Sequence, residues 1–325
     1  MTPGRILATV GAAATLTLAA AGCGLGAGPK SDGQARLSVT RDYGEESLLA
    51  ATVSDPAASE TVIRMLDREA RMTTRYGGGF VQSIEGLQGT VADDRSLDWF
   101  FYVNGVESPV GAAEVQVRAG DRIWWDYRDW MQAMRVPAVI SSWPEPFAQG
   151  SAPGEPLPVQ VACATRRTSC DQVARQLATE GVDVSVEPTS GKEEGGEGEA
   201  EALRLLVGPW ARIRADPAAA LLDDGPSVSG VFARPRDVAG HGYELVALDQ
   251  RAEPAVELAE GDGLVAAVRD GERPPTWLVT AGEAEGMDAA VAMLEGEALT
   301  DRYAVASVDG EPVSVPVGPA IGGVR

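Results

Sequence analysis

The stretch GDRIWWDYRDWM, residues 120–131, constrains the fold of this chain more than any other segment. It holds three of the seven tryptophans of the 325-residue sequence. Successive side chains of a β-strand point to opposite faces, so Ile123, Trp125 and Tyr127 share one face and Trp124 lies on the other. The sequence therefore predicts a strand that turns one aromatic face into a core beneath a helix.

The opposite face, with Trp124 and the nearby Trp130, has two interpretations. Its side chains either complete the core and the strand edge, or form a platform on which a flat ligand stacks, since aromatic side chains with polar neighbours line many ligand pockets. In the second case Arg122, Arg128 and Arg135 would donate hydrogen bonds to anionic ligand groups; otherwise they are solvated surface arginines. The sequence leaves both interpretations open.

Segment 35–143 predicts a small α+β domain around this strand. Within residues 59–72, Val62, Leu66 and Ala70 recur at helical spacing, which predicts one amphipathic helix. Runs of apolar and aromatic residues bounded by glycine or asparagine predict the strands. These are expected at 35–44, 80–86 and 97–105, with two short strands in 115–127.

The segments DWFFYVNGVE and VRAGDRIWWDY carry a resemblance to a known family. Their pattern, W-x-x-Y-x-N-G followed by G-D-x-I-x-W-x-Y, resembles the small C-terminal domain of transcobalamin and intrinsic factor, which also occurs in bacterial surface lipoproteins. The resemblance covers residues 35–143. The matching residues are Trp99, Tyr102, Asn104, Gly105, Gly120, Asp121, Ile123, Trp125 and Tyr127.

This resemblance implies a β-grasp-like fold for the N-terminal domain. It also implies a corrinoid-like ligand, because in the cobalamin carriers this domain closes over one side of the corrin. Cobalamin would then be a ligand, and no cofactor or metal ion is expected. The candidate ligand-binding residues are Trp99, Tyr102, Asn104, Trp124, Trp130 and Arg128.

Segment 158–317 predicts a second domain, of α/β class. Three successive passages alternate strand, helix and strand, which favours an α/β or ferredoxin-like arrangement. The acidic, glycine-rich loop 188–200 is expected to be disordered, and 318–325 is expected to form a tail. The proline- and glycine-rich stretch 144–157 predicts a linker between the two domains.

Cys163 and Cys170 form the one cysteine pair within the predicted domains. Outside the cytoplasm such a pair predicts a structural disulfide, and two buried thiols are the alternative. Closing so short a loop would contribute about 2–3 kcal/mol on the chain-entropy model. The spacing suits neither a zinc knuckle nor a redox C-x-x-C motif.

Residues 1–22 predict a signal peptide that ends in a lipobox. Arg5 precedes the apolar run 6–21, which is too short for a comfortable membrane span. LAAAGC then places Cys23 where bacterial lipoproteins are diacylated, by palmitate or a similar acyl chain. We therefore expect residues 23–34 to tether the mature chain to the extracytoplasmic face of the cell membrane. An ordinary secreted protein with a stray cysteine is the alternative.

Several functional classes are excluded or disfavoured by the sequence. The single histidine, His241, excludes His-dependent triads and two-His metal sites, and no Walker loop, GxGxxG or GxSxG motif occurs. A net charge of −21 repels phosphate backbones, so nucleic acid is not an expected partner. No pair of carboxylates stands out, and we expect the chain not to be an enzyme.

Together these patterns predict a membrane-tethered extracytoplasmic lipoprotein that binds a small molecule, corrinoid-like if the resemblance extends to function. It would support uptake beside a membrane transporter. The alternative function is a structural or protein-interaction module of the cell surface that has no small-molecule ligand.

Overall fold

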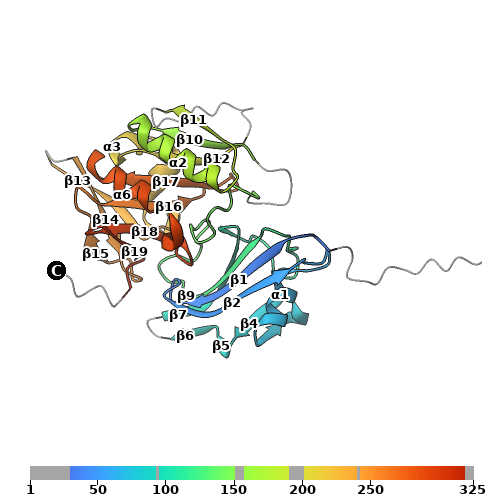
Figure 1. The fold of residues 1–325 in the computed structure, drawn as a ribbon. Coiled ribbons are helices and arrows are strands. Elements are labelled where there is room, and N and C mark those ends of the chain that lie inside the picture. Colours follow the sequence, from blue (N-terminus) through green and yellow to red (C-terminus); the bar gives the residue numbers. More distant parts are fainter. Residues whose placement is uncertain (1–29, 93–94, 151–156, 190–200, 240–241, 319–325) are drawn as a thin grey trace, which may run out of the picture.

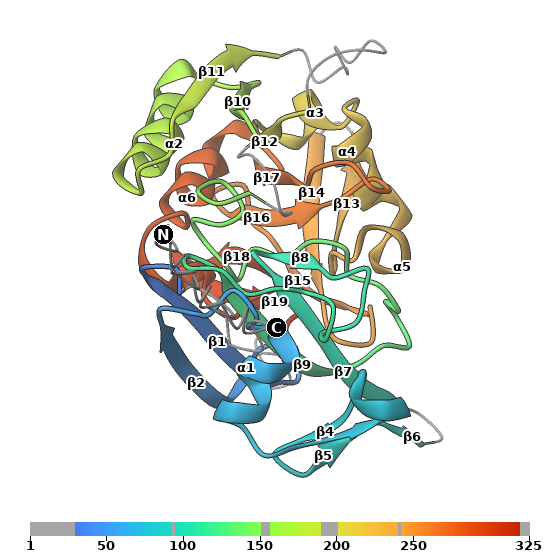
Figure 2. The same cartoon turned by 90° about the vertical axis from the view of Figure 1, so that its right-hand side faces the viewer.

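The computed structural model describes residues 30–92, 95–150, 157–189, 201–239 and 242–318. They form an N-terminal part, residues 30–129, and a C-terminal part, residues 157–318, joined by a connecting segment, residues 130–150 (Figure 1). Both parts contain sheets and helices, which confirms the predicted α+β class. Figure 2 shows the sheet of the N-terminal part lying against the C-terminal part.

The N-terminal part is built on a sheet with the order β2-β1-β9-β7-β6, to which β8 adds by pairing with β7. The central strands β1 and β9 are parallel, whereas β2 and β7 run antiparallel to their neighbours. A hairpin followed by a helix, with the first and last strands parallel at the centre, is the predicted β-grasp arrangement. The elements are β1 (Gln34–Arg41), β2 (Glu46–Ser54), α1 (Val62–Glu69), β6 (Thr90–Ala92), β7 (Arg95–Val103), β8 (Val106–Glu107) and β9 (Arg122–Asp129). A small second sheet holds β3 (Met72–Arg75), β4 (Phe80–Ile84) and β5 (Leu87–Gln88), with the 3₁₀ turn η1 (Tyr76–Gly78) between β3 and β4.

Helix α1 covers one face of this sheet. Its buried residues Val62, Met65 and Leu66 share a core with Leu37 of β1 and Trp125 of β9. The helix is shorter than the predicted segment, because the backbone is extended at both caps, including the one at Ala70, where the apolar spacing had continued. The spacing of apolar residues does not show where the backbone leaves the helical conformation.

The strand prediction was incomplete: the short strands β3, β5, β6 and β8 were not expected. Strand β2 was not expected, because its residues are exposed or half-buried and carry a weak alternation at the sheet edge. The strand expected before Gly120 is absent from the described residues; Gln116 makes only an isolated bridge to Thr61.

The C-terminal part is built on a seven-stranded mixed sheet, ordered β11-β10-β12-β17-β16-β18-β19. Its first four strands are parallel and the remaining three pair antiparallel. This is the α/β alternative rather than a four-stranded ferredoxin-like sheet. The strands are β10 (Val159–Cys163), β11 (Val184–Pro188), β12 (Leu203–Val207), β16 (Gly263–Val268), β17 (Thr276–Ala281), β18 (Ala304–Val308) and β19 (Glu311–Val315).

The two faces of this sheet are covered differently. On one face, α2 (Arg167–Thr179) and α6 (Met287–Ala292) bury residues such as Val173 and Val291. On the other face lie three antiparallel strands and several short helices, whose core includes Leu245 and Phe232. These elements are α3 (Trp210–Ile213), α4 (Pro217–Ala220), η2 (Leu221–Asp224), α5 (Pro226–Ser229), β13 (Ala233–Val238), β14 (Gly242–Leu248) and β15 (Pro254–Glu257). The 3₁₀ turns η3 (Ala284–Gly286) and η4 (Gly296–Leu299) flank α6.

The connecting segment is packed rather than extended into solvent. Ile140 and Phe147 belong to the core around α2 and α6, and Val136 and Val139 to the core on the opposite face. The predicted linker 144–157 therefore begins with mostly buried residues. Several predicted features lie outside the described residues: the signal peptide, most of the tether, linker residues 151–156, most of the loop 188–200, His241 and nearly all of the tail.

Candidate functional site

The two faces of β9 lead to two different surroundings. Ile123, Trp125 and Tyr127 lie in the core beneath α1, as the alternation predicted. Trp124 is only 1% exposed, yet it belongs to a different core, shared with the C-terminal part. The opposite face of the N-terminal sheet is thus covered mainly by the second half of the chain rather than left open to solvent.

An aromatic cluster fills the contact between the two parts. The Trp124 ring lies 5.3 Å from that of Tyr102 and 4.9 Å from that of Tyr303, measured between ring centroids. Tyr43 packs edge-on against Tyr303 at 5.0 Å. Because these four side chains are buried, Tyr102 and Trp124 have the role of core residues, which is the first of the two interpretations of this face.

Asp126 is a carboxylate buried in this same contact. It accepts hydrogen bonds from the Thr40 hydroxyl at 2.6 Å and from the Tyr303 hydroxyl at 2.9 Å. The backbone N–H groups of Tyr43 and Gly44 donate to it as well. Burial raises the pKa of Asp126 to about 6, and the hydrogen bonds counteract part of that rise. Four donors, three from residues 40–44 and one from Tyr303, therefore converge on one carboxylate that links the two parts.

Arg128 is a buried cation with internal partners. Its guanidinium donates to the carbonyl oxygens of Ala133 at 2.6 Å and of Met134 at 3.2 Å. The guanidinium carbon lies 3.8 Å from the centroid of the Phe100 ring, in cation–π geometry. Arg128 thus fixes the start of the connecting segment. Arg135, by contrast, is largely exposed and pairs with Glu107 at 3.1 Å.

The remaining predicted ligand-binding residues are dispersed. Trp99 is buried and its indole N–H donates to the carbonyl oxygen of Leu87 at 2.9 Å. Asn104 adopts a positive φ of 53° and its side-chain amide donates to Asp121 at 3.0 Å, so it organises a turn. Trp130 is half-buried just past the end of β9. The six residues do not converge on one site.

Of the two cysteine predictions, the structure describes only the disulfide. Cys163 at the end of β10 and Cys170 in α2 form a disulfide, which confirms the structural alternative. Cys23 lies outside the described residues.

A cleft of about 630 Å³ opens where the two parts meet beside the aromatic cluster. We call it the central cleft. Its volume falls within the range of small-molecule sites. Its floor is the sheet face of β2, β1 and β9, where paired residues on adjacent strands lie side by side. The floor residues are Arg36, Ser38, Ala50, Thr52, Arg122 and Trp124. The facing wall comes from the end of α2 and the region of η4, and includes Gln176, Thr179, Glu180, Glu295, Glu297 and Thr300.

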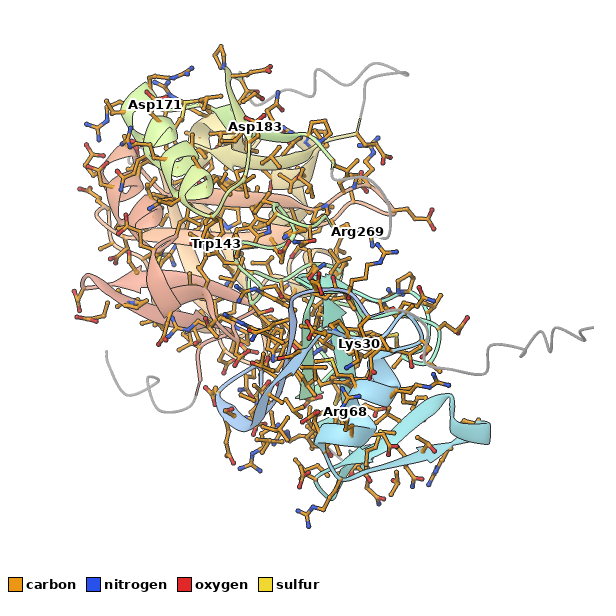
Figure 3. The ribbon with its side chains drawn as sticks, turned by 45° about the vertical axis from the view of Figure 1, so that its right-hand side comes forward. Lys30, Arg68, Trp143, Asp171, Asp183 and Arg269 are labelled. Carbon is orange, nitrogen blue, oxygen red and sulfur yellow. A yellow bond between two sulfur atoms is a disulfide. The ribbon has the colours of Figure 1, made fainter. Side chains whose placement is uncertain are left out.

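The third side of the central cleft is formed by Ser141, Ser142, Trp143 and Pro144 of the connecting segment. Trp143 is half-buried and its ring packs against that of Trp277, with the ring centroids 5.6 Å apart. Figure 3 labels Trp143 near the junction of the two parts. Sequence reasoning missed this tryptophan as a site residue, because it falls at the boundary assigned to the linker. Trp143 and the buried Ser141 and Ser142 line a cleft only because the two parts pack against each other.

The floor carries two positive charges that take part in no short ion pair with another described residue. Arg36 and Arg122 are paired in register on parallel strands. Neither takes part in an ion pair within the described part of the chain. The pKa of Arg122 is lowered, chiefly by burial and then by the neighbouring charge of Arg36, and the charges of Glu145 and Glu180 counteract part of that lowering. Arg122 is half-buried and Arg36 is exposed, and two guanidiniums placed together at a cleft form a site to which an anion is attracted.

A separate apolar feature lies at the tip of the β3–β4 hairpin. Tyr76 is 86% exposed and Phe80 is 46% exposed, and their rings stack edge-on at 6.1 Å. Val110 is exposed on a neighbouring loop, where Gly111 approaches the carbonyl oxygen of Gly79. Exposed aromatic side chains grouped in this way are typical of contact surfaces.

Comparison with known proteins adds information about the N-terminal part. Residues 59–129 match a family model described as a domain of unknown function, DUF4430. The match includes both segments that resemble the transcobalamin C-terminal domain and is compatible with that resemblance. No curated protein matches.

One solved structure covers 30% of this chain and 98% of its own: a protein from Ruminococcus gnavus described as a candidate metal-binding protein. The identity is 12% and the TM-score 0.24, too low for any conclusion. Among the described residues, no group of three or more metal-ligating side chains is arranged to hold a metal ion, and no helix is long and apolar enough to cross a membrane. The family comparison thus shows that residues 59–129 of the chain are similar to the DUF4430 family.

Proposed function

We propose that this chain is a binding protein that holds a small molecule in the central cleft. The observation that carries the proposal is the pair Arg36 and Arg122, which face a cleft of suitable volume without ion-pair partners among the described residues. Trp143 adds an aromatic surface beside them, and small residues such as Ala50 leave the floor open. A concave site with a few polar groups is the usual form of a ligand site.

Equilibrium dialysis against a library of small metabolites tests this function. Ala50→Trp introduces a large side chain on the exposed cleft floor and should abolish retention of compounds that wild type retains. Ser54→Trp is the matched control, because Ser54 is exposed on the same face of β2 but does not line the cleft. The proposal fails if wild type retains nothing, or if Ala50→Trp retains what wild type retains.

We further propose that the chain acts at the extracytoplasmic face of the cell membrane, anchored through Cys23, and supports uptake beside a membrane transporter. The lipobox sequence LAAAGC supports this proposal. Metabolic labelling with radioactive palmitate should mark the wild-type chain and leave Cys23→Ala unlabelled. Labelling of both chains, or of neither, would contradict anchoring at Cys23.

A corrinoid is the first flat ligand to test, because of the resemblance to the transcobalamin domain. Trp124 and Trp143 both border the cleft, but Trp124 is 1% exposed and Trp143 is half-buried, so Trp143 is the tryptophan on which a ligand in the cleft would stack and quench fluorescence. Saturable quenching by cobalamin that is lost in Trp143→Ala supports the corrinoid. If cobalamin does not change the tryptophan fluorescence of the folded protein, the corrinoid is not the ligand.

We propose binding without catalysis. Two of the facing carboxylates, Glu180 and Glu297, are exposed, and Asp301 accepts a hydrogen bond from Ser38 at 2.8 Å. None of them has the arrangement of a paired acid and base on one substrate. A retained compound recovered chemically unchanged after long incubation supports this; a converted product would contradict it.

A protein-interaction module of the cell surface is the second candidate function. The exposed pair Tyr76 and Phe80 favours it, since contiguous exposed aromatics mark contact surfaces. Cross-linking in native membranes should then yield a stoichiometric protein partner that Tyr76→Ser with Phe80→Ser loses. Met134→Ser is the control, because Met134 is similarly exposed outside this hairpin.

A further inference from the structure

The central cleft has walls of opposite charge. Arg36 and Arg122 lie on the floor contributed by the N-terminal part, and Glu180, Glu295 and Glu297 lie on the wall contributed by the C-terminal part. Within the described residues none of these five side chains forms a short ion pair, so the charges of the two walls are not paired directly with one another. A ligand that fits between them meets positive charge on one side and negative charge on the other.

The positive wall suits an oxyanion. Arg36 and Arg122 face each other across adjacent strands, which are about 4.8 Å apart. The guanidinium group presents a planar fork of donors that matches carboxylate and phosphate oxygens. Most of their neighbours on the floor are small: Ser38 and Ala50 lie on the next rung beside the buried Trp124, and Thr52 lies beside Arg36. Small side chains leave space above the two arginines.

The negative wall suits a cation. Glu180 follows the C-terminal end of α2, and its charge, after that of Glu145, counteracts part of the lowering of the pKa of Arg122, so it acts across the cleft. Glu295 accepts a hydrogen bond from the Gln176 side chain at 2.9 Å, which orients one of its oxygens. Both glutamates are exposed and keep acceptor capacity for an ammonium group. Trp143 borders the same space, and a tryptophan ring attracts a cation placed over its face.

We infer that the ligand of the central cleft is a small zwitterion, with a carboxylate or phosphate bound by Arg36 and Arg122 and an ammonium group facing Glu180 and Glu295. This inference rests on the proposed binding function and specifies the chemical class of its ligand. Carboxylate and phosphate share the chemistry that the arginine pair recognises, and the experiment separates them.

Isothermal titration calorimetry on the full mature chain tests the inference with four probes. Phosphoethanolamine and γ-aminobutyrate are zwitterions with a phosphate and a carboxylate, whereas inorganic phosphate and ethylamine each carry one of the charges. We expect at least one zwitterion to bind about tenfold more tightly than either single-charge probe. Which of the two binds more tightly distinguishes the oxyanion.

Two sets of variants assign the charges to the walls. Arg36→Gln with Arg122→Gln should weaken the zwitterion at least tenfold and also abolish binding of phosphate. Glu180→Gln with Glu295→Gln should weaken the zwitterion to a similar extent and should not weaken phosphate binding, because a negative charge near the phosphate is removed. Arg122→Lys keeps the positive charge but replaces the planar guanidinium by an ammonium group. An affinity between those of wild type and the double variant would show that the weaker binding is not caused by misfolding. Unfolding midpoints of all variants provide the same check.

The outcomes separate this inference from the proposed function. If inorganic phosphate binds as tightly as the zwitterions and the glutamate variants have no effect, the ligand class is wrong while the cleft still binds an anion. If none of the four probes binds, the inference is overturned, and the dialysis comparison of wild type with Ala50→Trp decides the binding function by itself. If the zwitterions bind equally well to wild type and to both variant pairs, they bind elsewhere and the inference is overturned as well.

Discussion

Replacing Tyr303 by phenylalanine tests what holds the two parts together. The Tyr303 hydroxyl, just before β18, donates a 2.9 Å hydrogen bond to the buried carboxylate of Asp126 in β9. A hydrogen bond to a charged group contributes about 1.5–3 kcal/mol, and a neutral one about 0.5–1.5 kcal/mol. Phenylalanine fills nearly the same space, so no cavity adds to the loss. We expect Tyr303→Phe to lower the free energy of unfolding by about 1.5–3 kcal/mol when Asp126 is ionised.

The loss should depend on pH, because burial raises the pKa of Asp126 from an ordinary 3.8 to about 6. At about pH 8 the carboxylate is ionised, and at about pH 4.5 it is protonated, so the expected loss falls to about 0.5–1.5 kcal/mol. In wild type, between these two pKa values the folded state retains a proton that the unfolded state has lost. The contribution of Asp126 to stability therefore decreases as pH rises through this window, by about 3 kcal/mol for a shift of roughly two units.

Urea unfolding at both pH values, followed by tryptophan fluorescence and far-UV circular dichroism, measures these losses. Tyr102→Phe is the matched control, because the Tyr102 hydroxyl donates only a 3.4 Å bond to the Tyr303 hydroxyl. Both tyrosines are buried in the same cluster. Equal losses for the two variants, or a Tyr303→Phe loss that is identical at both pH values, would refute the reasoning.

Two further predictions concern stability. Gly44→Ala should lower the thermal midpoint well below that of Gly77→Ala, because an added Cβ at Gly44 would lie 1.8 Å from the carbonyl oxygen of Asp301, whereas at Gly77 it meets nothing within 4 Å. Both glycines have positive φ, so the backbone strain of about 1–2 kcal/mol is common to both; equal midpoints would contradict the close approach. Reducing the Cys163–Cys170 disulfide should lower the free energy of unfolding by about 2–3 kcal/mol. Denaturation curves with and without reductant measure this, and coincident curves would show that the bond does not stabilise the fold.

Much of the N-terminal fold could be predicted because its residues alternate with the period of a strand. Ile123, Trp125 and Tyr127 occupy the core face for that reason alone. The edge strand β2 was not predicted, because its exposed and half-buried residues show little alternation of apolar and polar side chains. In the candidate site, Arg122 was considered as an anion-binding residue, whereas Arg36 and Trp143 were not, since no local pattern connects them.

The sequence by itself determined which side chains share a face of each strand and the α+β class, and it favoured the pairing of Cys163 with Cys170 that the structure shows. Those properties follow from backbone periodicity and from the chemistry of nearby residues. Only the tertiary structure decided that the Trp124 face would be covered by the C-terminal part, so that Tyr102 and Trp124 are core residues and not a ligand platform. It also decided that the arginines of β1 and β9 would face the glutamates near α2. These contacts join residues far apart in the chain, and they depend on how two separately formed surfaces pack, which local periodicity does not encode.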